Sequence, residues 1–286
     1  MTRTGKDILA IGVNYGSDES AIRYAGSLLN LNHQGLSIRL VDNTERGPAD
    51  FESFTEKIRG VNRDAICLQT VGNPGYFGGA RMALDSFLQE HGRMPDWVIV
   101  SNVDIEFPDD ALVEELGRRW GMDDLGVIAP AILSAETKID INPMFVNRPS
   151  KRRMNFYKAV FGNYYSGNFY EALSVLKSSI KTAGIIKGSG REEAPPERFI
   201  YAPHGSCIIF SHRYFSRGGT LAYPQILFNE EIFVAETALR LGLKVLYNPR
   251  IRVIHAEHVS TGRFRSRKVA SLFAESSKYV TETYFS

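Results

Sequence analysis

Residues 97–110 read WVIVSNVDIEFPDD. An apolar run begins a predicted strand, Asn102 and Asp104 come at its carboxyl end, and Pro108 stops it. Open α/β sheets bind ligands at that end, and alternate side chains of a strand share one face. Oxygen ligands of this kind suit Mg²⁺ or Mn²⁺, which leave positions for substrate phosphates, so the stretch indicates a nucleotide diphosphate site. The alternative is a polar strand end with Asp109 capping the next helix.

Length and composition describe a globular protein. The chain has 286 residues, of which 43% are hydrophobic and 11% aromatic, enough for a sizeable core. Its formal net charge of +2 is too mild to indicate a nucleic-acid partner. Cys67 and Cys207 both lie in apolar runs, which fits a reducing compartment. Because neither a signal peptide nor a membrane-spanning run is visible, the sequence predicts a cytoplasmic protein.

Strands and amphipathic helices alternate through the first half of the chain. Apolar runs predict strands over residues 8–13, 37–41, 65–68 and 97–103. A glycine-rich loop over residues 71–79 precedes a helix that begins near Ala80. The order βαβαβαβ predicts an α/β fold, with a Rossmann-like, mostly parallel central sheet and helices on both faces. We expect one domain over residues 1–286.

The middle of the chain, residues 134–198, has a different character. Lys151, Arg152 and Arg153 precede a series of aromatic residues that ends at Tyr165. Basic and aromatic side chains together suit a membrane interface or an anionic acceptor. A surface excursion with a solvated run of charges is the alternative.

A regular pattern returns at residue 199. The periodicity predicts a helix over about residues 230–241, with Asn229 as its cap and Leu239 among its inward-facing residues. Glu230 and Glu231 fall in the first turn, where the helix dipole favours the ionised carboxylate that a general base requires. Dipole stabilisation alone is the other interpretation. Two short strands follow, at residues 244–247 and 250–254, and His255 ends the second.

Seven motifs in this order resemble a family. They are NYG after the first strand, VDN at 41–43, NPGYFGGARMALD at 73–85, SNVD at 101–104, HGSCIIF at 204–210, FNEE at 228–231 and NPRIRVIH at 248–255. Together they resemble the family 2 inverting glycosyltransferases of the GT-A fold, with most similarity to the bacterial rhamnosyltransferase-like and O-antigen branch. The resemblance implies a nucleotide-sugar-binding half (residues 1–133), the basic and aromatic insertion (134–198) and an acceptor-side half with the catalytic helix (199–286).

The resemblance also implies roles for individual residues. It assigns donor binding to the end of the first strand, the VDN aspartate, the N-x-G-x-x-G loop with the arginine that follows, and the first position of the D-x-D motif. These residues are Val13, Asn14, Asp42, Asn73, Gly75, Gly78, Gly79, Arg81 and Asn102. Asp104 and His255 would hold the metal, Mg²⁺ or Mn²⁺, while Asn102 replaces a carboxylate of the family pattern with a neutral oxygen. Glu231 would be the catalytic base, with Glu230 in reserve.

The implied reaction is inverting transfer of a sugar from a nucleotide diphosphate, dTDP-rhamnose or a UDP-hexose, to a hydroxyl group. The acceptor would be a glycan or a lipid-linked glycan in cell-surface polysaccharide synthesis, reached by peripheral contact with the anionic inner face of the cytoplasmic membrane. A catalytically silent member that binds nucleotide sugar or scaffolds a glycan-assembly complex is the alternative, and Asn102 is the residue that favours it. A dinucleotide oxidoreductase is excluded, because GVNYGSDES after the first strand lacks the G-x-G-x-x-G motif, and a Walker-type NTPase is excluded, because no G-x-x-x-x-G-K-S/T occurs in the sequence.

Overall fold

The structure, a computed structural model, describes residues 7–167, 196–256 and 266–286. The chain divides into two compact units, each assembled from three segments. Unit 1 consists of Met1–Arg148, Glu197–Ile226 and Glu230–Glu257. Unit 2 consists of Pro149–Pro196, Leu227–Asn229 and His258–Ser286. The predicted middle segment, 134–198, is therefore divided between the units, with most of it in unit 2.

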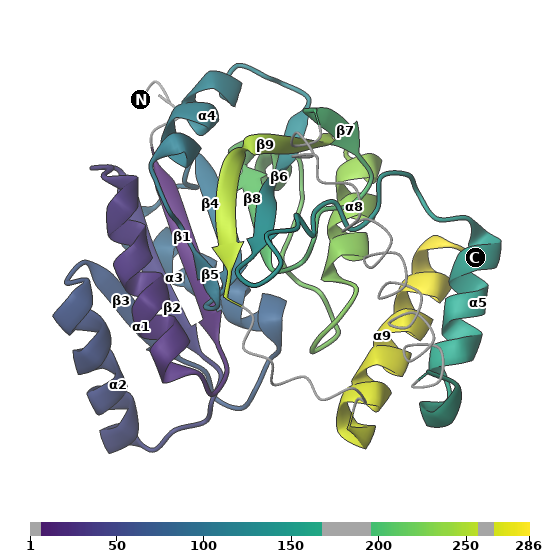
Figure 1. Cartoon of the computed structure of the whole chain (residues 1–286), viewed down its shortest axis with the longest axis horizontal. Coiled ribbons are helices and arrows are strands. Elements are labelled where there is room, and N and C mark those ends of the chain that lie inside the picture. Colours follow the sequence, from purple (N-terminus) through teal and green to yellow (C-terminus); the bar gives the residue numbers. More distant parts are fainter. Residues whose placement is uncertain (1–6, 168–195, 257–265) are drawn as a thin grey trace. The chain divides into compact units, whose positions relative to one another are not determined.

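Unit 1 is built on a nine-stranded sheet (Figure 1). The strands are β1 (Ile8–Asn14), β2 (Leu36–Asp42), β3 (Ala65–Gln69), β4 (Trp97–Asn102), β5 (Ile105–Glu106), β6 (Leu125–Ser134), β7 (Arg198–Ile200), β8 (Cys207–Ser211) and β9 (Lys244–His255). Their order is β3-β2-β1-β4-β8-β6-β9-β5, and β7 also pairs with β9. β8 is antiparallel to β4 and β6, and β5 and β7 are antiparallel to β9; the other pairs are parallel. This confirms the predicted mostly parallel sheet.

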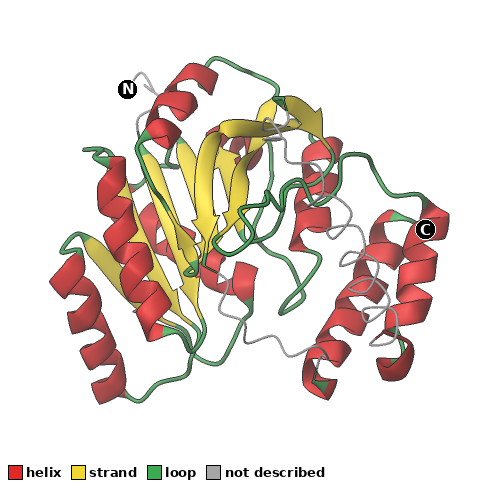
Figure 2. Ribbon diagram, viewed as in Figure 1, coloured by secondary structure: helices red, strands yellow, loops and turns green. Residues whose placement is uncertain are grey.

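Helices cover both faces of this sheet (Figure 2). Those of unit 1 are α1 (Asp18–Ser27), the 3-10 turn η1 (Leu28–Leu31), α2 (Pro48–Val61), α3 (Tyr76–His91), α4 (Ala111–Arg119), α7 (His212–Ser216) and α8 (Glu230–Arg240). In Figure 1, α1 and α2 lie in front of the sheet and α3 behind it.

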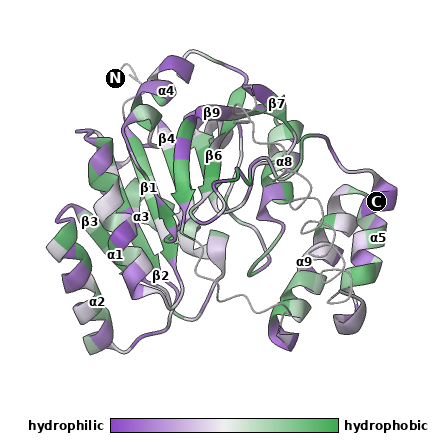
Figure 3. Cartoon of the chain, viewed as in Figure 1, coloured by the Kyte–Doolittle hydropathy of each residue, from purple (hydrophilic) through white to green (hydrophobic). Residues whose placement is uncertain are grey.

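Alternation along the strands explains the two layers. Ile8 and Ala10 of β1 join a core cluster with Tyr24 of α1, whereas Leu9 and Ile11 are equally buried outside that cluster. Successive side chains of a strand point to opposite faces, so a strand buried on both faces reads as a continuous apolar run. The central strands are accordingly almost wholly hydrophobic (Figure 3).

Some predicted details of the helices and strands were wrong. Leu239, predicted to face inward, is 57% exposed, because the neighbouring positions of α8 already supply its buried stripe. The two strands predicted after residue 243 are a single strand, β9, whose register with β6 shifts after Pro130. A register irregularity interrupts the apolar pattern without ending the strand, and periodicity alone reads it as a break.

Unit 2 contains a pair of helices, α5 (Lys151–Phe161) and α9 (Arg267–Tyr284). Ser150 and Ser266 cap them, each accepting a hydrogen bond from the backbone N–H three residues later. The helices pack through the buried Met154 and Thr281: the Thr281 hydroxyl donates to the Ser277 carbonyl of its own helix at 2.7 Å and lies 3.4 Å from the Met154 carbonyl of α5. Within the described ranges, no helix combines the length and the apolar character needed to cross a membrane.

Candidate active site

The strand register brings the predicted donor-binding residues to one edge of the sheet. Asn14 at the end of β1 pairs with Asp42 of β2, and Val13 pairs with Asn102 of β4. On the other side of the sheet, His255 at the end of β9 pairs with Ile105. All of these except Ile105 lie at the carboxyl ends of parallel strands, where ligands bind in such sheets.

Asp42 is fully buried, and side chains occupy both of its carboxylate oxygens. Oδ1 accepts from Asn14 Nδ2 at 2.8 Å and from the Thr44 hydroxyl at 2.5 Å, while Oδ2 accepts from Arg46 Nε at 2.6 Å. Arg46 also pairs with Asp18 at the start of α1. The hydrogen bond between Asn14 and Asp42 therefore connects the ends of β1 and β2, and Arg46, which the sequence did not point to, binds the second oxygen of Asp42.

The predicted glycine loop is shorter than expected. Helix α3 begins at Tyr76, not near Ala80, so Gly78 and Gly79 lie inside its first turn. The prediction took these glycines as loop formers, but they allow close packing: a Cβ on Gly79 would lie 3.0 Å from Asn43 Oδ1, and one on Gly78 2.7 Å from Pro74.

The remaining loop, residues 73–75, is held from two sides. The Asn73 side chain accepts a hydrogen bond from the Gly75 N–H at 2.9 Å, and Tyr76 N–H donates to the Ile226 carbonyl at 3.0 Å. Arg81, expected near the anion, lies on an exposed part of α3, 3.7 Å from Asp85.

The D-x-D region differs from the expected continuous strand. β4 ends at Asn102, and Val103 and Asp104 form a turn, because the chain reverses there into β5. Asn102 and Asp104 are thus not successive residues of one strand face. The predicted cap of the next helix is off by one residue: the N-cap of α4 is Asp110, while the Asp109 carboxylate accepts the N–H of Ala111 at 3.1 Å.

Asp104 and His255 form a pair at this edge. His255 Nε2 lies 3.3 Å from Asp104 Oδ2, and the Asp104 carbonyl accepts the N–H of Ala256 at 2.8 Å. Asp104 Oδ1 is buried, and none of the described residues donates a hydrogen bond to it. A buried carboxylate oxygen without a donor, beside an imidazole, is a donor set that fits Mn²⁺ or Mg²⁺. In the described ranges, no group of three or more His, Cys, Asp and Glu side chains could hold a metal ion.

The loop at residues 203–206 borders this pair and carries a histidine that the sequence analysis left without a role. Ser206 donates its backbone N–H to His204 Nδ1 at 3.2 Å, so Nδ1 is an acceptor and the neutral ring carries its proton on Nε2. Burial first, and then the neighbouring His255, lower the pKa of His204 to about 4. The Ser206 carbonyl accepts the N–H of Asn102 at 3.0 Å, which ties the loop to the end of β4.

Glu230 and Glu231 begin α8 and are both buried, with 4% and 8% exposure. Burial raises the pKa of Glu231 to about 7, which outweighs the lowering effect expected from its position at the start of the helix. Glu231 Oε2 lies 3.5 Å from the position that a Cβ on Gly205 would occupy, so this carboxylate faces the loop at residues 203–206. After burial and Cys207, the charge of Glu230 helps to raise the pKa of the buried Tyr76.

A third glutamate of α8 holds the helix in place. Glu236 Oε1 accepts from Arg148 Nε at 2.7 Å and from the Tyr201 hydroxyl at 2.5 Å, and Glu236 Oε2 accepts from Arg148 Nη2 at 3.2 Å. A bidentate arginine pair of this kind is geometrically specific. Sequence reasoning could not find it, because the three residues are far apart in the chain.

No family model and no curated protein matches the chain. Among solved structures, it resembles the crystal structure of GalNAc-T7 with UDP, GalNAc and Mn²⁺, with a TM-score of 0.59, 13% identity and coverage of 98% of this chain. The chain spans 50% of the length of that protein. It also resembles the mannosyltransferase PcManGT from Pyrobaculum calidifontis in complex with GDP-Man and Mn²⁺, with a TM-score of 0.50, 12% identity and coverage of 96% of this chain and 72% of that one. At these identities the likeness concerns the fold, and this protein has the GT-A fold of those glycosyltransferases.

Proposed function

We propose that this protein is an inverting glycosyltransferase that moves a sugar from a nucleotide diphosphate to a hydroxyl group of a glycan or lipid-linked acceptor. The observation that carries the proposal is Glu231, a buried carboxylate with a pKa raised to about 7, facing a loop that is bonded to the end of β4. A general base is most effective when its pKa lies near the working pH. The same loop borders Asp104 and His255, the two residues suited to a metal–diphosphate complex.

In the proposed reaction, Glu231 accepts the proton of the acceptor hydroxyl as its oxygen bonds to the anomeric carbon. The bond from that carbon to the diphosphate oxygen breaks on the opposite face, so the configuration inverts. Asp104 and His255 would hold the divalent cation, with Asn102 beside them. When bound, such a cation neutralises the negative charge that develops on the leaving diphosphate. Val13, Asn14, Asp42, Asn73, Gly75, Gly78 and Gly79 would form the donor-binding edge.

We place the activity in bacterial cell-surface polysaccharide synthesis, with dTDP-rhamnose or a UDP-hexose as donor. The family resemblance of the motifs supports this assignment. A panel of nucleotide sugars tested by thermal stabilisation, with Mn²⁺, with Mg²⁺ and with chelator, would identify the donor. A ligand at 100 times its Kd should stabilise the native state by about 2.7 kcal/mol.

Two substitutions test the roles separately. Glu231→Gln keeps the shape but cannot take a proton, so it should bind donor normally and lose about 10²- to 10⁴-fold in transfer rate. Asp104→Asn should instead lose metal-dependent donor binding in calorimetry. Glu230→Gln is the matched control, because it removes the neighbouring charge of the same helix turn, and we expect it to retain turnover. If Glu231→Gln turns over within about threefold of the parent, the base is not Glu231.

The second candidate, a catalytically silent nucleotide-sugar-binding protein, is favoured by Asn102, a neutral amide where the family pattern has a carboxylate. It predicts donor binding without turnover in the parent protein. Steady, acceptor-dependent release of nucleoside diphosphate by the parent would eliminate it.

A further inference from the structure

Unit 2 carries a concentrated positive charge. Its described residues include seven Lys and Arg and two Glu, a net charge of +5, whereas the whole chain has +2. Helix α5 contains four basic residues and no acidic one. The basic residues come from both helices, although these are more than a hundred residues apart in sequence.

Packing of the two helices turns these charges outward. Met154 is the buried residue of α5, and Lys151, Arg152, Arg153 and the half-exposed Phe156 lie on the remaining surface. On α9, Arg267, Lys268 and Lys278 are exposed in the same way.

Most of these cations have no anionic partner of their own. Among the described residues, no carboxylate lies within ion-pair distance of Lys151, Arg152, Arg267, Lys268 or Lys278. Lys158 pairs with Glu282 at 3.5 Å. Exposed cations that the protein does not neutralise remain available to an external polyanion.

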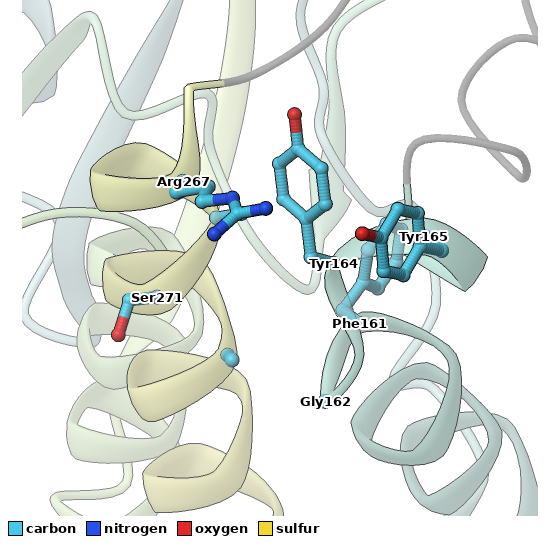
Figure 4. A pocket seen from close by; sticks show the side chains of 8 residues that line it. Phe161, Gly162, Tyr164, Tyr165, Arg267 and Ser271 are labelled. Carbon is cyan, nitrogen blue, oxygen red and sulfur yellow. The ribbon is translucent and has the colours of Figure 1, made fainter.

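A pocket lies between the end of α5 and the start of α9 (Figure 4). Its volume is about 400 Å³, within the range of small-ligand sites, and Phe161, Tyr164, Tyr165, Arg267 and Ser271 line it. The Arg267 guanidinium extends toward the Tyr164 ring, 5.8 Å from its centroid, and Tyr165 is 71% exposed. The guanidinium can bind a phosphate group, and the aromatic rings beside it suit the boundary between lipid and water. The pocket therefore fits a phospholipid headgroup.

We propose that unit 2 is a docking surface for an anionic phospholipid membrane, with one headgroup phosphate bound at Arg267 in this pocket. Charge complementarity selects the occupant, since the surface is basic on both helices and presents aromatic residues among the cations. On this surface the proposed glycosyltransferase would meet a lipid-linked acceptor, and to that extent the inference rests on the proposed function. Binding itself requires only unit 2, so the two ideas can fail independently.

Vesicle sedimentation tests the proposal with the full chain. The parent should bind vesicles of phosphatidylcholine with phosphatidylglycerol, fail to bind phosphatidylcholine alone, and dissociate as NaCl is raised. Each basic residue near an anionic surface contributes about fivefold in affinity, so the triple change Lys151→Ser, Arg152→Ser, Arg153→Ser should weaken binding roughly a hundredfold. Arg267→Ser should weaken it by at least about fivefold.

Three controls keep the outcome interpretable. The change Lys57→Ser, Arg59→Ser, Arg63→Ser removes the same charge from exposed positions of unit 1 and should leave binding unchanged. The charge-conserving change Lys151→Arg, Arg152→Lys, Arg153→Lys should bind like the parent. Thermal stabilisation by nucleotide sugar should be the same in parent and triple variant, which separates loss of docking from loss of the donor site.

The proposal would be overturned by equal binding to neutral vesicles, by unchanged sedimentation of the Lys151, Arg152 and Arg153 triple variant, or by an equal loss in the unit 1 control. Competition by soluble glycerol phosphate as strong as that by vesicles would also overturn it, because it would show a site for free phosphate esters in place of a membrane surface.

Discussion

At the scale of single residues, burial sets the pKa of one carboxylate. Glu231 is 8% exposed at the start of α8, and loss of hydration raises its pKa from 4.5 to about 7. The start of a helix favours the charged form by a smaller amount, about 0.3–1 kcal/mol, so burial prevails. A carboxyl group in this state is partly ionised at neutral pH and can both take and release a proton.

We expect the transfer rate to rise with pH through a midpoint near 7, because only ionised Glu231 can accept a proton. The stability should move in the opposite direction: a raised folded-state pKa stabilises the protein below pH 4.5, and this contribution is lost as the pH rises through 7. Glu231→Gln should abolish the rising limb of the rate profile and make the protein more stable than the parent above neutral pH, on the order of 1 kcal/mol per unit of pKa shift. Profiles of kcat/KM and of Tm against pH measure both effects, and an unchanged limb in residual Glu231→Gln activity would assign it to another group.

At the scale of elements, backbone contacts hold the loop between β3 and α3 beside the proposed donor-binding edge. Gly75 has a φ of +83°, and a Cβ there would lie 2.2 Å from the carbonyl oxygen of Ile226. Glycine is therefore required at position 75 for two reasons: the positive φ, and the lack of room for a Cβ beside the Ile226 carbonyl. The neighbouring Gly72 also has a positive φ, +69°, but a Cβ there would meet open space.

The two glycines make a matched pair of substitutions. Gly72→Ala should lower the free energy of unfolding by about 1 kcal/mol, the cost of the left-handed conformation alone. Gly75→Ala should lower it by about 3 kcal/mol or more, since the backbone must also move away from Ile226. Urea unfolding measures the difference. Equal losses at the two positions would mean that the contact with Ile226 gives way easily.

At the scale of the whole molecule, the chain combines a sheet that presents the candidate site with a separate helical unit. The rings that hold unit 2 together come from three segments: Phe273 of α9 contacts Phe161 at 4.6 Å between centroids and Phe228 at 5.0 Å. Edge-to-face contacts of this kind add to the area that the rings bury.

Phe273→Ala should lower the free energy of unfolding of unit 2 by about 2 kcal/mol, because both aromatic contacts disappear. Phe156→Ala is the control in the same unit, since Phe156 is 50% exposed and its loss should cost under about 0.5 kcal/mol. Limited proteolysis, followed by mass spectrometry, should show faster cleavage within α5 for Phe273→Ala only. Equal cleavage of the two variants would show that the Phe273 cluster does not stabilise the unit.

Periodicity and strand ends were sufficient for much of the fold. The sequence by itself predicted β1 to β4 nearly to the residue, the start of α8 and the mostly parallel sheet, because apolar runs and caps are local signals. The family resemblance assigned Val13, Asn14, Asp42 and Asn102 to donor binding, and the strand register places these four residues at one edge, since parallel strands share the position of their carboxyl ends. The reversed direction of β8 left no such local mark, because a buried strand reads alike in either direction.

Only the tertiary structure decided how these groups behave. Folding brings together the residues on which three features depend. They are the hydrogen bond from Arg46 to Asp42, the contact between Asp104 and His255, and the high pKa of Glu231. The basic surface of unit 2 likewise exists because α9 packs against α5. Sequence spacing determines on which face of its own helix or strand a side chain lies. Burial depends instead on the residues that the rest of the chain packs against that face, and burial in turn sets the pKa of a group and whether its charge is neutralised.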